Sequence, residues 1–289
     1  MSQSIGTKNQ LTYLSIPAVV FTLALIAFPF AYTIWLSLHE FTFGGASTLN
    51  YGKNYALMLE DAEFWNGLKI TLILYVLSLA LQLVLGTYVA ILLHGSKKLS
   101  GIVRTLMISP FVLPPVVVGM MWLVVLDPSI GAANFILATL GLPRSDWLAS
   151  PQWVIPTVAF VDTWQWTPYV ALIVLGGLQS LPPNVYEAAQ IDGASRAKTF
   201  WRITLPLLMP TIVTAAILRS VDLLRFFDII YITTQGGPGN ASNTLNIYGF
   251  RKGFEFFEIG YASALMVTLS AIVLGAVVIL TQARKRVAW

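Results

Sequence analysis

The sequence contains no cysteine, only two histidines, and few charged residues for its length. Without cysteine there is no disulfide, no thiolate ligand for zinc and no cysteine nucleophile. His39 and His94 stand too far apart to form a metal-binding motif. Charged residues make up 10% of the 289 positions, against roughly 25% in an ordinary soluble domain. This composition excludes thiol-based sites and disfavours a water-soluble fold.

A nucleotide-binding P-loop is also missing from the sequence. No segment reads GxxxxGK(S/T), and the nearest candidate, GSKK at Gly95, lacks both the preceding glycine and the hydroxyl residue. No motif combines a nucleophile, a base and an orienting group. We therefore expect that the chain is not an enzyme and binds no metal, nucleotide or other cofactor. Its net charge of +4 comes from short basic clusters beside apolar runs, so we expect no nucleic-acid partner.

Long hydrophobic runs dominate what is present. Hydrophobic residues make up 56% of the chain and the mean hydropathy is +0.74. A helix needs about 20 mostly apolar residues to cross the hydrocarbon core of a bilayer. Six runs meet this length, at about 11–38, 67–93, 105–126, 154–178, 205–232 and 259–283. They predict an all-α integral membrane protein with six transmembrane helices in a single domain, residues 1–289.

The lysine and arginine residues between these runs predict the orientation of the chain. With the amino terminus inside, ten of them lie in inner segments and four in outer loops. The inner ten are Lys8, Lys97, Lys98, Arg104, Arg196, Lys198, Arg202, Arg284, Lys285 and Arg286, and the outer four are Lys53, Arg144, Arg251 and Lys252. Both termini and the segment 180–204 are therefore expected in the cytoplasm. The outer loops 39–65, 127–153 and 233–258 are long enough to face an external partner.

One polar stretch, EAAQIDGASRAKTFWRITLPLLMP at 187–210, separates two of the apolar runs. Good helix formers from Val185 to Asp192 predict a first short helix. Gly193 then stands where a helix end needs a residue that tolerates positive φ, and Ser195 can cap a second helix over 196–203. Pro206 then marks the entry to the fifth run. Each helix has only about eight or nine residues, too few to be stable alone in water. Either the stretch lies on the membrane as an amphipathic hairpin, or a partner packs on it.

The spacing of this stretch favours a partner. The residues that define this spacing are Glu187, Ala188, Ala189, Gly193, Ile203, Leu205 and Pro206. They resemble the EAA motif of permease subunits of ATP-binding-cassette (ABC) importers, in the variant of the carbohydrate-uptake branch. Further segments resemble the maltose-F-type membrane subunit of sugar importers: ISPFVLPPVV (108–117), VDTWQWTPY (161–169), LQSLPPNVYEAA (178–189), RFFDIIYITTQGGPG (225–239) and FEFFEIGYASAL (254–265). The extra amino-terminal helices and the large outer insert of the enterobacterial maltose subunit are absent.

The resemblance implies a type I ABC importer permease fold with a cytoplasmic EAA coupling helix between spans 4 and 5. The residues expected to couple to an ATPase are Glu187, Ala188, Ala189, Asp192 and Gly193. ATP and Mg would be bound by partner subunits. The implied partners are a second, G-type permease, two ABC ATPase subunits, a periplasmic solute-binding protein, a sugar and the lipid bilayer. The implied location is the bacterial inner membrane.

Besides Lys69 near the outer end of the second run, five charged residues lie within the runs, where each could cost about 2.5 to 3.5 kcal/mol on insertion scales. Asp162 lies in the fourth run, and the fifth carries charges of alternating sign at every third position, Arg219, Asp222, Arg225 and Asp228. From their depths, Asp162 and Arg219 can meet. This pair either locks helices together or forms part of a translocation cavity, and the two roles can coexist. Arg225 and Asp228 are assigned to helix packing.

The resemblance also implies which residues contact the substrate, since maltose-type permeases bind sugar with the helices on either side of the EAA loop. The corresponding positions are Asp162, Gln165, Trp166, Tyr169, Arg219, Asp222, Leu223 and Phe226. An interfacial aromatic belt is an equal alternative for Trp164, Trp166 and Tyr231, and we assign Trp147 and Trp153 to it.

We therefore expect a membrane permease subunit of an ATP-driven importer for a sugar, oligosaccharide or sugar derivative. Two alternatives stay open at this stage. One is an ABC permease for another solute, such as an anionic sugar derivative, a phosphate ester or an amino acid, in which Arg219 binds the anion. The other is an ion-coupled secondary transporter, which would account for the charges within the runs.

Overall fold

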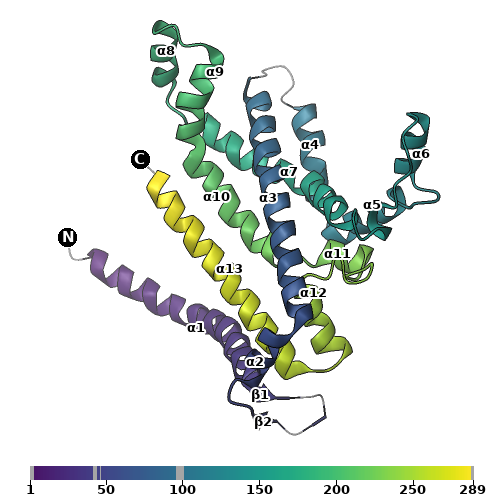
Figure 1. The fold of residues 1–289 in the computed structure, drawn as a ribbon. Coiled ribbons are helices and arrows are strands. Elements are labelled where there is room, and N and C mark those ends of the chain that lie inside the picture. The colour runs from purple at the N-terminus through teal and green to yellow at the C-terminus, as the bar shows by residue number, and fades with distance from the viewer. Residues whose placement is uncertain (1–2, 42–43, 46, 96–100, 288–289) are drawn as a thin grey trace. The chain divides into compact units, whose positions relative to one another are not determined.

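A computed structural model of the chain describes residues 3–41, 44–45, 47–95 and 101–287 (Figure 1). The described part is mainly helical, as predicted. The α-helices are α1 (Gln3–Ser37), α2 (Lys53–Glu60), α3 (Ala62–Gly95), α4 (Ile102–Val112), α5 (Pro115–Val125), α6 (Ala132–Thr139), α7 (Val154–Gln179), α8 (Pro183–Ile191), α9 (Arg196–Thr199), α10 (Leu205–Leu224), α11 (Asp228–Thr233), α12 (Leu245–Phe250) and α13 (Ile259–Val287). The shorter elements are a 3-10 turn, η1 (Trp147–Ala149), and two π-helical turns, η2 (Phe200–Thr204) and η3 (Arg251–Glu255). Two strands, β1 (His39–Glu40) and β2 (Thr48–Leu49), pair antiparallel.

Five helical segments of the described chain are long and apolar enough to cross a membrane, judged by length and composition alone. They are Tyr13–Ser37, Ala62–Gly95, Val154–Gln179, Arg196–Thr233 and Ile259–Val287. These segments match the first, second, fourth, fifth and sixth predicted runs. Lys97 and Lys98, two of the basic residues used to predict the orientation, lie outside the described residues.

The third predicted span is bent. Its two arms, Thr105–Val112 and Pro115–Val125, meet at an angle of 101°, so the span predicted over 105–126 is not one continuous helix. Leu113 precedes Pro114 and has extended backbone angles, φ −72° and ψ 136°. A proline disfavours the helical conformation in the residue before it, which accounts for the break. By length and composition, the described residues hold up to six candidate spans if the two arms count as one.

The fifth predicted span also differs from one straight helix. Helix α10 ends at Leu224, and Arg225 and Phe227 have non-helical backbone angles. A new short helix, α11, then begins at Asp228. The charged positions therefore do not continue along a single helix to Asp228, and depths calculated from a constant rise hold only as far as Leu224.

The chain divides into two compact units, each described here by itself. Unit 1 comprises Met1–Asp61 and Gly249–Thr268, and unit 2 comprises Ala62–Tyr248 and Leu269–Trp289. In unit 1, α2 and the strand pair follow α1, and Gly260 at the start of α13 donates its N–H to Phe41 O. Unit 2 holds the longest packed helices, which position the site described below.

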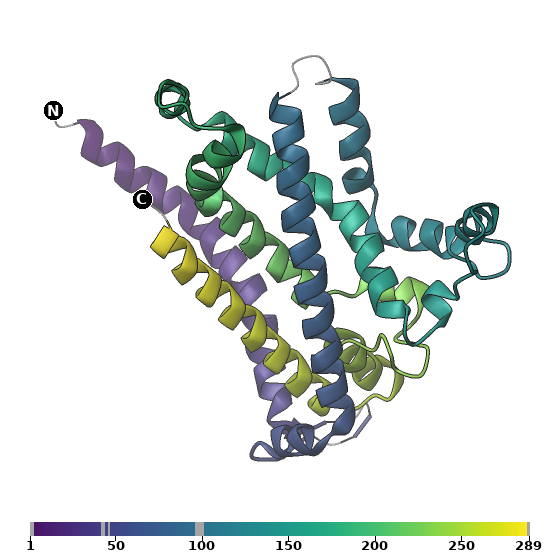
Figure 2. The same ribbon diagram turned by 45° about the horizontal axis from the view of Figure 1, so that its top comes forward.

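Within unit 2, α3 and α7 pack along each other, and both contact α10 (Figures 1 and 2). Small residues permit this close approach. A Cβ on Gly86 of α3 would lie 2.6 Å from Cγ1 of Val170 on α7, and one on Gly177 of α7 would lie 2.7 Å from the side chain of Thr211 on α10. Helices in membranes commonly pack through such small residues because they have little hydrophobic drive to associate. The three helices bring together polar side chains that lie far apart in the sequence.

Candidate functional site

A buried ion pair joins α7 to α10. Arg219 Nη2 lies 3.3 Å from both carboxylate oxygens of Asp162, which confirms the predicted meeting of these residues. The exposed fractions of the two side chains are 1% and 0%. Buried charges are stable only when they are paired and hydrogen-bonded. The pair therefore needs further polar partners around it.

Gln82 of α3 supplies such a partner to both charges. Its Nε2 donates to Asp162 Oδ2 at 2.5 Å, and its Oε1 accepts from Arg219 Nε at 2.8 Å. The Gln82 side chain is fully buried. Gln82 is not among the residues predicted for the site, although Thr71, Ser78, Gln82 and Gly86 recur at helical spacing through an apolar run. That polar and small stripe is the signal that could have found it.

The remaining contacts of Arg219 connect this network to a cavity. Arg219 Nη1 lies 3.3 Å from Asp222 Oδ2, and the Asp222 side chain is 49% exposed. The guanidinium carbon lies 4.1 Å from the ring centroid of Trp166, in cation–π contact. Arg219 thus has partners for Nε and for both terminal nitrogens. One of these partners, Asp222, is partly exposed.

The cavity has a volume of about 360 Å³. Its lining includes five of the eight predicted substrate-contact residues, which are Asp162, Trp166, Arg219, Asp222 and Phe226. The other lining residues are Pro115, Arg225, Phe227, Asp228 and Asn246. The lining thus combines three carboxylates, two guanidinium groups and aromatic rings, and it lies beside the breaks after α4 and α10.

The other three predicted contacts lie elsewhere. Gln165 is buried, and its Nε2 donates to Leu113 O at 2.9 Å, so it stabilises the bend between α4 and α5. Leu223 is 1% exposed and belongs to the packed interior. Tyr169 stacks on Phe111, with ring centroids 5.2 Å apart, and meets the Trp166 ring edge-on. None of the three lines the cavity in this conformation.

Arg225 and Asp228 differ from their predicted role in helix packing. Both are exposed and line the cavity, because the chain leaves the helical path at Arg225 and starts a new helix at Asp228. Asn246 Nδ2 donates to Arg225 O at 2.8 Å and so provides a partner for a carbonyl freed at the end of α10. The prediction treated both residues as members of one long helix, and that was wrong.

The aromatic residues divide between packing and exposure. Trp164 and Tyr231 pack against the buried cluster around Val158 and Ile230, whereas Trp153 is 53% exposed. Trp147 donates its indole N–H to Asn134 Oδ1 at 3.0 Å. The assignment of Trp147 and Trp153 to an interfacial belt stays a prediction.

The EAA segment has the predicted local structure at its corner. Helix α8 begins at Pro183 and is followed by Gly193 with φ +68°, and Ser195 Oγ accepts from the N–H of Lys198. A Cβ on Gly193 would meet nothing within 4 Å, so backbone conformation rather than space within this chain requires the glycine. The corner is therefore set by positive φ.

The second helix of the segment is not a separate short helix. Helix α9 continues through the π-turn η2 into α10, so the polypeptide is helical from Arg196 to Leu224. Pro206, predicted to mark the entry to the fifth run, lies inside this continuous helix directly after the π-turn η2 and does not end it. The EAA corner and Arg219 therefore lie on or beside one continuous helix.

Helices α8 and α9 of the EAA segment lie where α7 ends and α10 begins (Figure 1). Glu187, Ala188, Asp192 and Gly193 are exposed, and Ala189 is buried. Ile191 is 87% exposed and Trp201 on η2 is 65% exposed. Large apolar side chains exposed beside polar ones are typical of an interaction surface.

Comparison with known proteins places the chain in a family. Residues 82–285 match the family model described as "Binding-protein-dependent transport system inner membrane component". The chain is 35% identical over 269 residues to the trehalose/maltose transport system permease protein MalF of Thermococcus litoralis, covering 92% of this chain and 91% of that protein. It is 33% identical over 278 residues to the sn-glycerol-3-phosphate transport system permease protein UgpA of Agrobacterium fabrum, covering 94% of each.

Among solved structures, the chain resembles one subunit of a bacterial ABC transporter involved in the import of the acidic polysaccharide alginate. The TM-score is 0.84 with 24% sequence identity, and the match covers 99% of both chains. At this identity the likeness shows a shared fold.

Proposed function

This chain belongs to the family of binding-protein-dependent transport system inner membrane components, and from that premise we propose that it forms one half of the channel of a sugar importer. The family consists of membrane permeases, so the chain is not an enzyme and the ion-coupled secondary transporter is excluded. The proposed cargo is a sugar, oligosaccharide or sugar derivative. The observation that carries the proposal is the cavity in unit 2 where Trp166, Arg219 and Asp222 meet.

The lining of this cavity suits a polyhydroxylated molecule. Hydroxyl groups both donate and accept hydrogen bonds, so they can pair with the half-exposed carboxylate of Asp222 and with Asn246. One face of Trp166 is already covered by Arg219, so a sugar ring would stack on its other face or pack beside Phe226. The cavity thereby offers polar partners around an apolar surface, as carbohydrate sites require.

Anionic cargo is the second candidate, and the structure changes which residue would bind it. UgpA, a relative, is named for transport of sn-glycerol-3-phosphate. Arg219, however, already donates to Gln82, Asp162 and Asp222. Arg225 is the more exposed guanidinium in the cavity and would be the anion partner. The nearby carboxylates of Asp222 and Asp228 favour the neutral sugar.

The EAA segment is the proposed site of coupling to a cytoplasmic ATPase. Glu187 would accept a charge-assisted hydrogen bond from the ATPase, and Ala188 would allow close approach of its backbone. Ile191 and Trp201 add exposed apolar surface for the same contact. ATP and Mg would be bound by that partner.

The continuous helix from α9 to α10 suggests how the two sites communicate. When ATP binding closes the ATPases, they would draw the coupling segments of both permeases together. A displacement of α9 would pass along the continuous helix to Arg219, which pairs with Asp162 and lines the cavity. The cavity would then switch between inward-open and outward-open states.

The full assembly we propose contains this chain, a G-type permease, two ATPase subunits and a periplasmic solute-binding protein. The chain would act as a single permease domain in the bacterial inner membrane, with both termini in the cytoplasm. The excess of basic residues in the inner segments supports this orientation.

The proposal is tested on the assembled importer reconstituted in liposomes. We expect uptake of a neutral sugar such as trehalose or maltose, driven by ATP and dependent on the binding protein. Glu187→Ala should lower both uptake and substrate-stimulated ATP hydrolysis, because it removes a contact with the ATPase. Unchanged uptake and hydrolysis would contradict the coupling assignment. Uptake of glycerol 3-phosphate but of no neutral sugar, with loss of uptake in Arg225→Gln, would favour the anionic cargo.

A further inference from the structure

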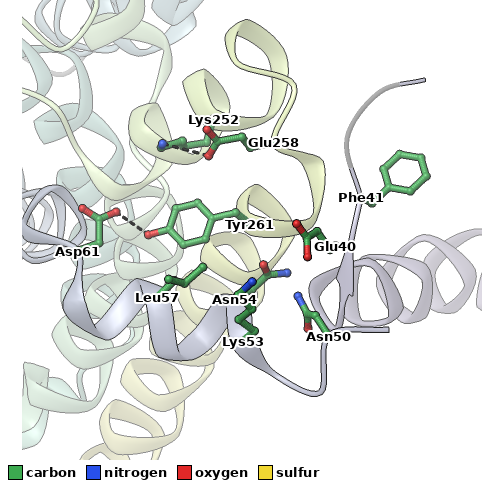
Figure 3. A pocket seen from close by; sticks show the side chains of 10 residues that line it. All are labelled: Glu40, Phe41, Asn50, Lys53, Asn54, Leu57, Asp61, Lys252, Glu258 and Tyr261. Carbon is green, nitrogen blue, oxygen red and sulfur yellow. Dashed lines mark hydrogen bonds and ion pairs between the residues drawn. The ribbon is translucent and has the colours of Figure 1, made fainter. Parts of the chain in front are cut away.

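Unit 1 contains a second cavity, which the proposed transport function does not use. It has a volume of about 320 Å³. Its walls come from the β1–β2 pair, one face of α2, and the segment from η3 to the first turn of α13 (Figure 3). Small-molecule sites typically begin at about this size. The cavity is therefore large enough for one or two sugar rings.

The wall formed by α1, β1 and α2 is held by buried polar contacts. Asn54 is buried, and its Nδ2 donates to Ser37 O at 2.9 Å and to His39 O at 3.0 Å. Gly260 lies against the same wall, where an added Cβ would lie on the His39 carbonyl oxygen. Only a glycine permits this approach. The wall is thus well defined before any ligand arrives.

The opposite wall consists of groups that are already paired. Lys252 Nζ lies 3.0 Å from Glu258 Oε2, and Tyr261 donates its hydroxyl to Asp61 Oδ2 at 2.5 Å. In Figure 3 the Lys252–Glu258 pair lies on one side of the Tyr261 ring, and Lys53 lies on the other. Because these groups have partners, the wall presents the Tyr261 ring in a fixed position.

Three lining groups have polar atoms with no partner among the residues that the structure describes. Asn50 Oδ1 accepts from the N–H of Gly52 at 3.1 Å, which fixes the orientation of the amide. Its Nδ2 is buried and has no hydrogen-bond partner within the described part of the chain. The side chains of Glu40 and Lys53 likewise form no ion pair or hydrogen bond with the residues that the structure describes. A buried donor without an acceptor lowers the stability of the fold, so the Asn50 amide in particular needs a hydrogen-bond partner.

We infer that this cavity binds a neutral, polyhydroxylated small molecule of mono- or disaccharide size. Such a ligand needs groups that accept from Asn50 and Lys53 and donate to Glu40, and hydroxyls do both. The Tyr261 ring and Leu57 give an apolar surface for the C–H face of a sugar.

Other ligand classes fit less well. An anion would meet the carboxylates of Glu40, Asp61 and Glu258, and a cation would meet Lys53 and Lys252. A zwitterion could also bridge Glu40 and Lys53, with its carboxylate accepting from Asn50, but that carboxylate would lie in a cavity that Asp61 and Glu258 also line. A neutral polyol uses the same three groups without adding a full charge to the cavity.

The inference is independent of the transport cavity, because every lining residue lies in unit 1. Only its exposure to the outer side of the membrane depends on the proposed topology. On that topology the site would hold sugar at the extracytoplasmic face.

Saturation-transfer NMR on the full chain in lipid nanodiscs tests this inference, with trehalose as the probe. We expect saturable binding with a dissociation constant of about 1 mM or lower. Asn50→Leu removes both amide donors at similar size, and Glu40→Gln removes the carboxylate. Each should weaken binding about fivefold or more, the loss expected for one hydrogen bond.

Two controls separate this site from others. Glu60→Gln makes the same substitution on an exposed residue of α2 that does not line the cavity, and it should leave binding unchanged. Trp166→Ala alters the transport cavity in unit 2 and should retain the trehalose signal. If Asn50→Leu does not fold, Glu40→Gln alone tests the inference. The Glu40 side chain is exposed and makes none of the contacts that hold the walls of the cavity.

Three results would overturn the inference. The first is the absence of saturable trehalose binding to the unmodified chain. The second is a signal that Trp166→Ala abolishes but Glu40→Gln does not, which places the sugar in the transport cavity and leaves the proposed function intact. The third is binding of glutamine, a zwitterion, that no sugar displaces.

Discussion

At the scale of single residues, Gln82 decides how two buried charges coexist. Asp162 and Arg219 contact each other at 3.3 Å, but Gln82 contacts each of them at a shorter distance, 2.5 and 2.8 Å. An amide can donate to the carboxylate with one end and accept from the guanidinium with the other. The ion pair is therefore better described as a three-residue network.

Gln82→Leu should destabilise the protein strongly. It leaves a carboxylate oxygen and a guanidinium N–H buried without a partner, at a cost of about 1–3 kcal/mol for each group or more. Thermal unfolding of the purified chain should show a clearly lower midpoint. Gln179→Leu, the same change at an exposed residue ending α7, should not. Equal midpoints for the two variants would mean that the network does not need the amide.

A pair of neutral substitutions separates structural from transport roles of the ion pair. Arg219→Gln alone should cost about 3–5 kcal/mol, because it leaves Asp162 buried and uncompensated. Adding Asp162→Asn should recover much of that stability, since no buried charge is left. We expect sugar uptake by the double variant to stay impaired, because Arg219 and Asp162 line the cavity. Restored stability together with wild-type uptake would assign the pair to helix packing alone.

At the scale of elements, two helix breaks and one continuous helix determine the geometry of the site. The bend at Leu113 and the interruption after Leu224 both place irregular backbone beside the cavity. Gln165 and Asn246 each donate to a carbonyl at one of these breaks. Irregular backbone is tolerated at membrane depth only where it is buried in protein or lines a cavity. By contrast, the helix from α9 to α10 has no break, so it can transmit movement.

Gly193→Val tests the corner between α8 and α9. Valine is strained at positive φ, by about 1–2 kcal/mol, so α8 should shift relative to α9. We expect weaker substrate-stimulated ATP hydrolysis by the assembled importer and unchanged sugar binding. Gly141→Val is a matched control, since Gly141 has φ +72° against +68° at Gly193, and neither Cβ would meet a neighbour. Equal effects of both variants on hydrolysis would remove any special role for the Gly193 corner.

At the scale of the whole molecule, the topology rests on loop charges, and the absence of cysteine makes it easy to test. Tyr51 and Ile191 are 90% and 87% exposed, so a cysteine at either position should be accessible to solvent. A membrane-impermeant thiol reagent should label Tyr51→Cys in intact cells whose outer membrane is permeabilised. It should label Ile191→Cys only after the inner membrane is opened, in cells that lack the ATPase proposed to cover this residue. The reverse pattern would place the EAA segment outside and contradict coupling to a cytoplasmic ATPase.

The sequence by itself determined the features that depend on neighbouring residues. Apolar runs long enough for a bilayer located the spans, and Gly193 and Ser195 predicted the corner and cap of the EAA segment, because backbone preference and capping act within a few residues. The positions of Asp162 and Arg219 along their apolar runs also predicted that the two side chains can meet. Pro114 indicated the bend at Leu113, but the continuous apolar run predicted a single span there.

Tertiary structure alone decided which polar groups share a space. Gln82 and Arg219 are 137 positions apart, and only the packing of α3, α7 and α10 brings them together. The cavity in unit 1 likewise joins residues near positions 50 and 260. Local propensities act along the chain, whereas a site depends on contacts across it, and those contacts exist only once helices have packed.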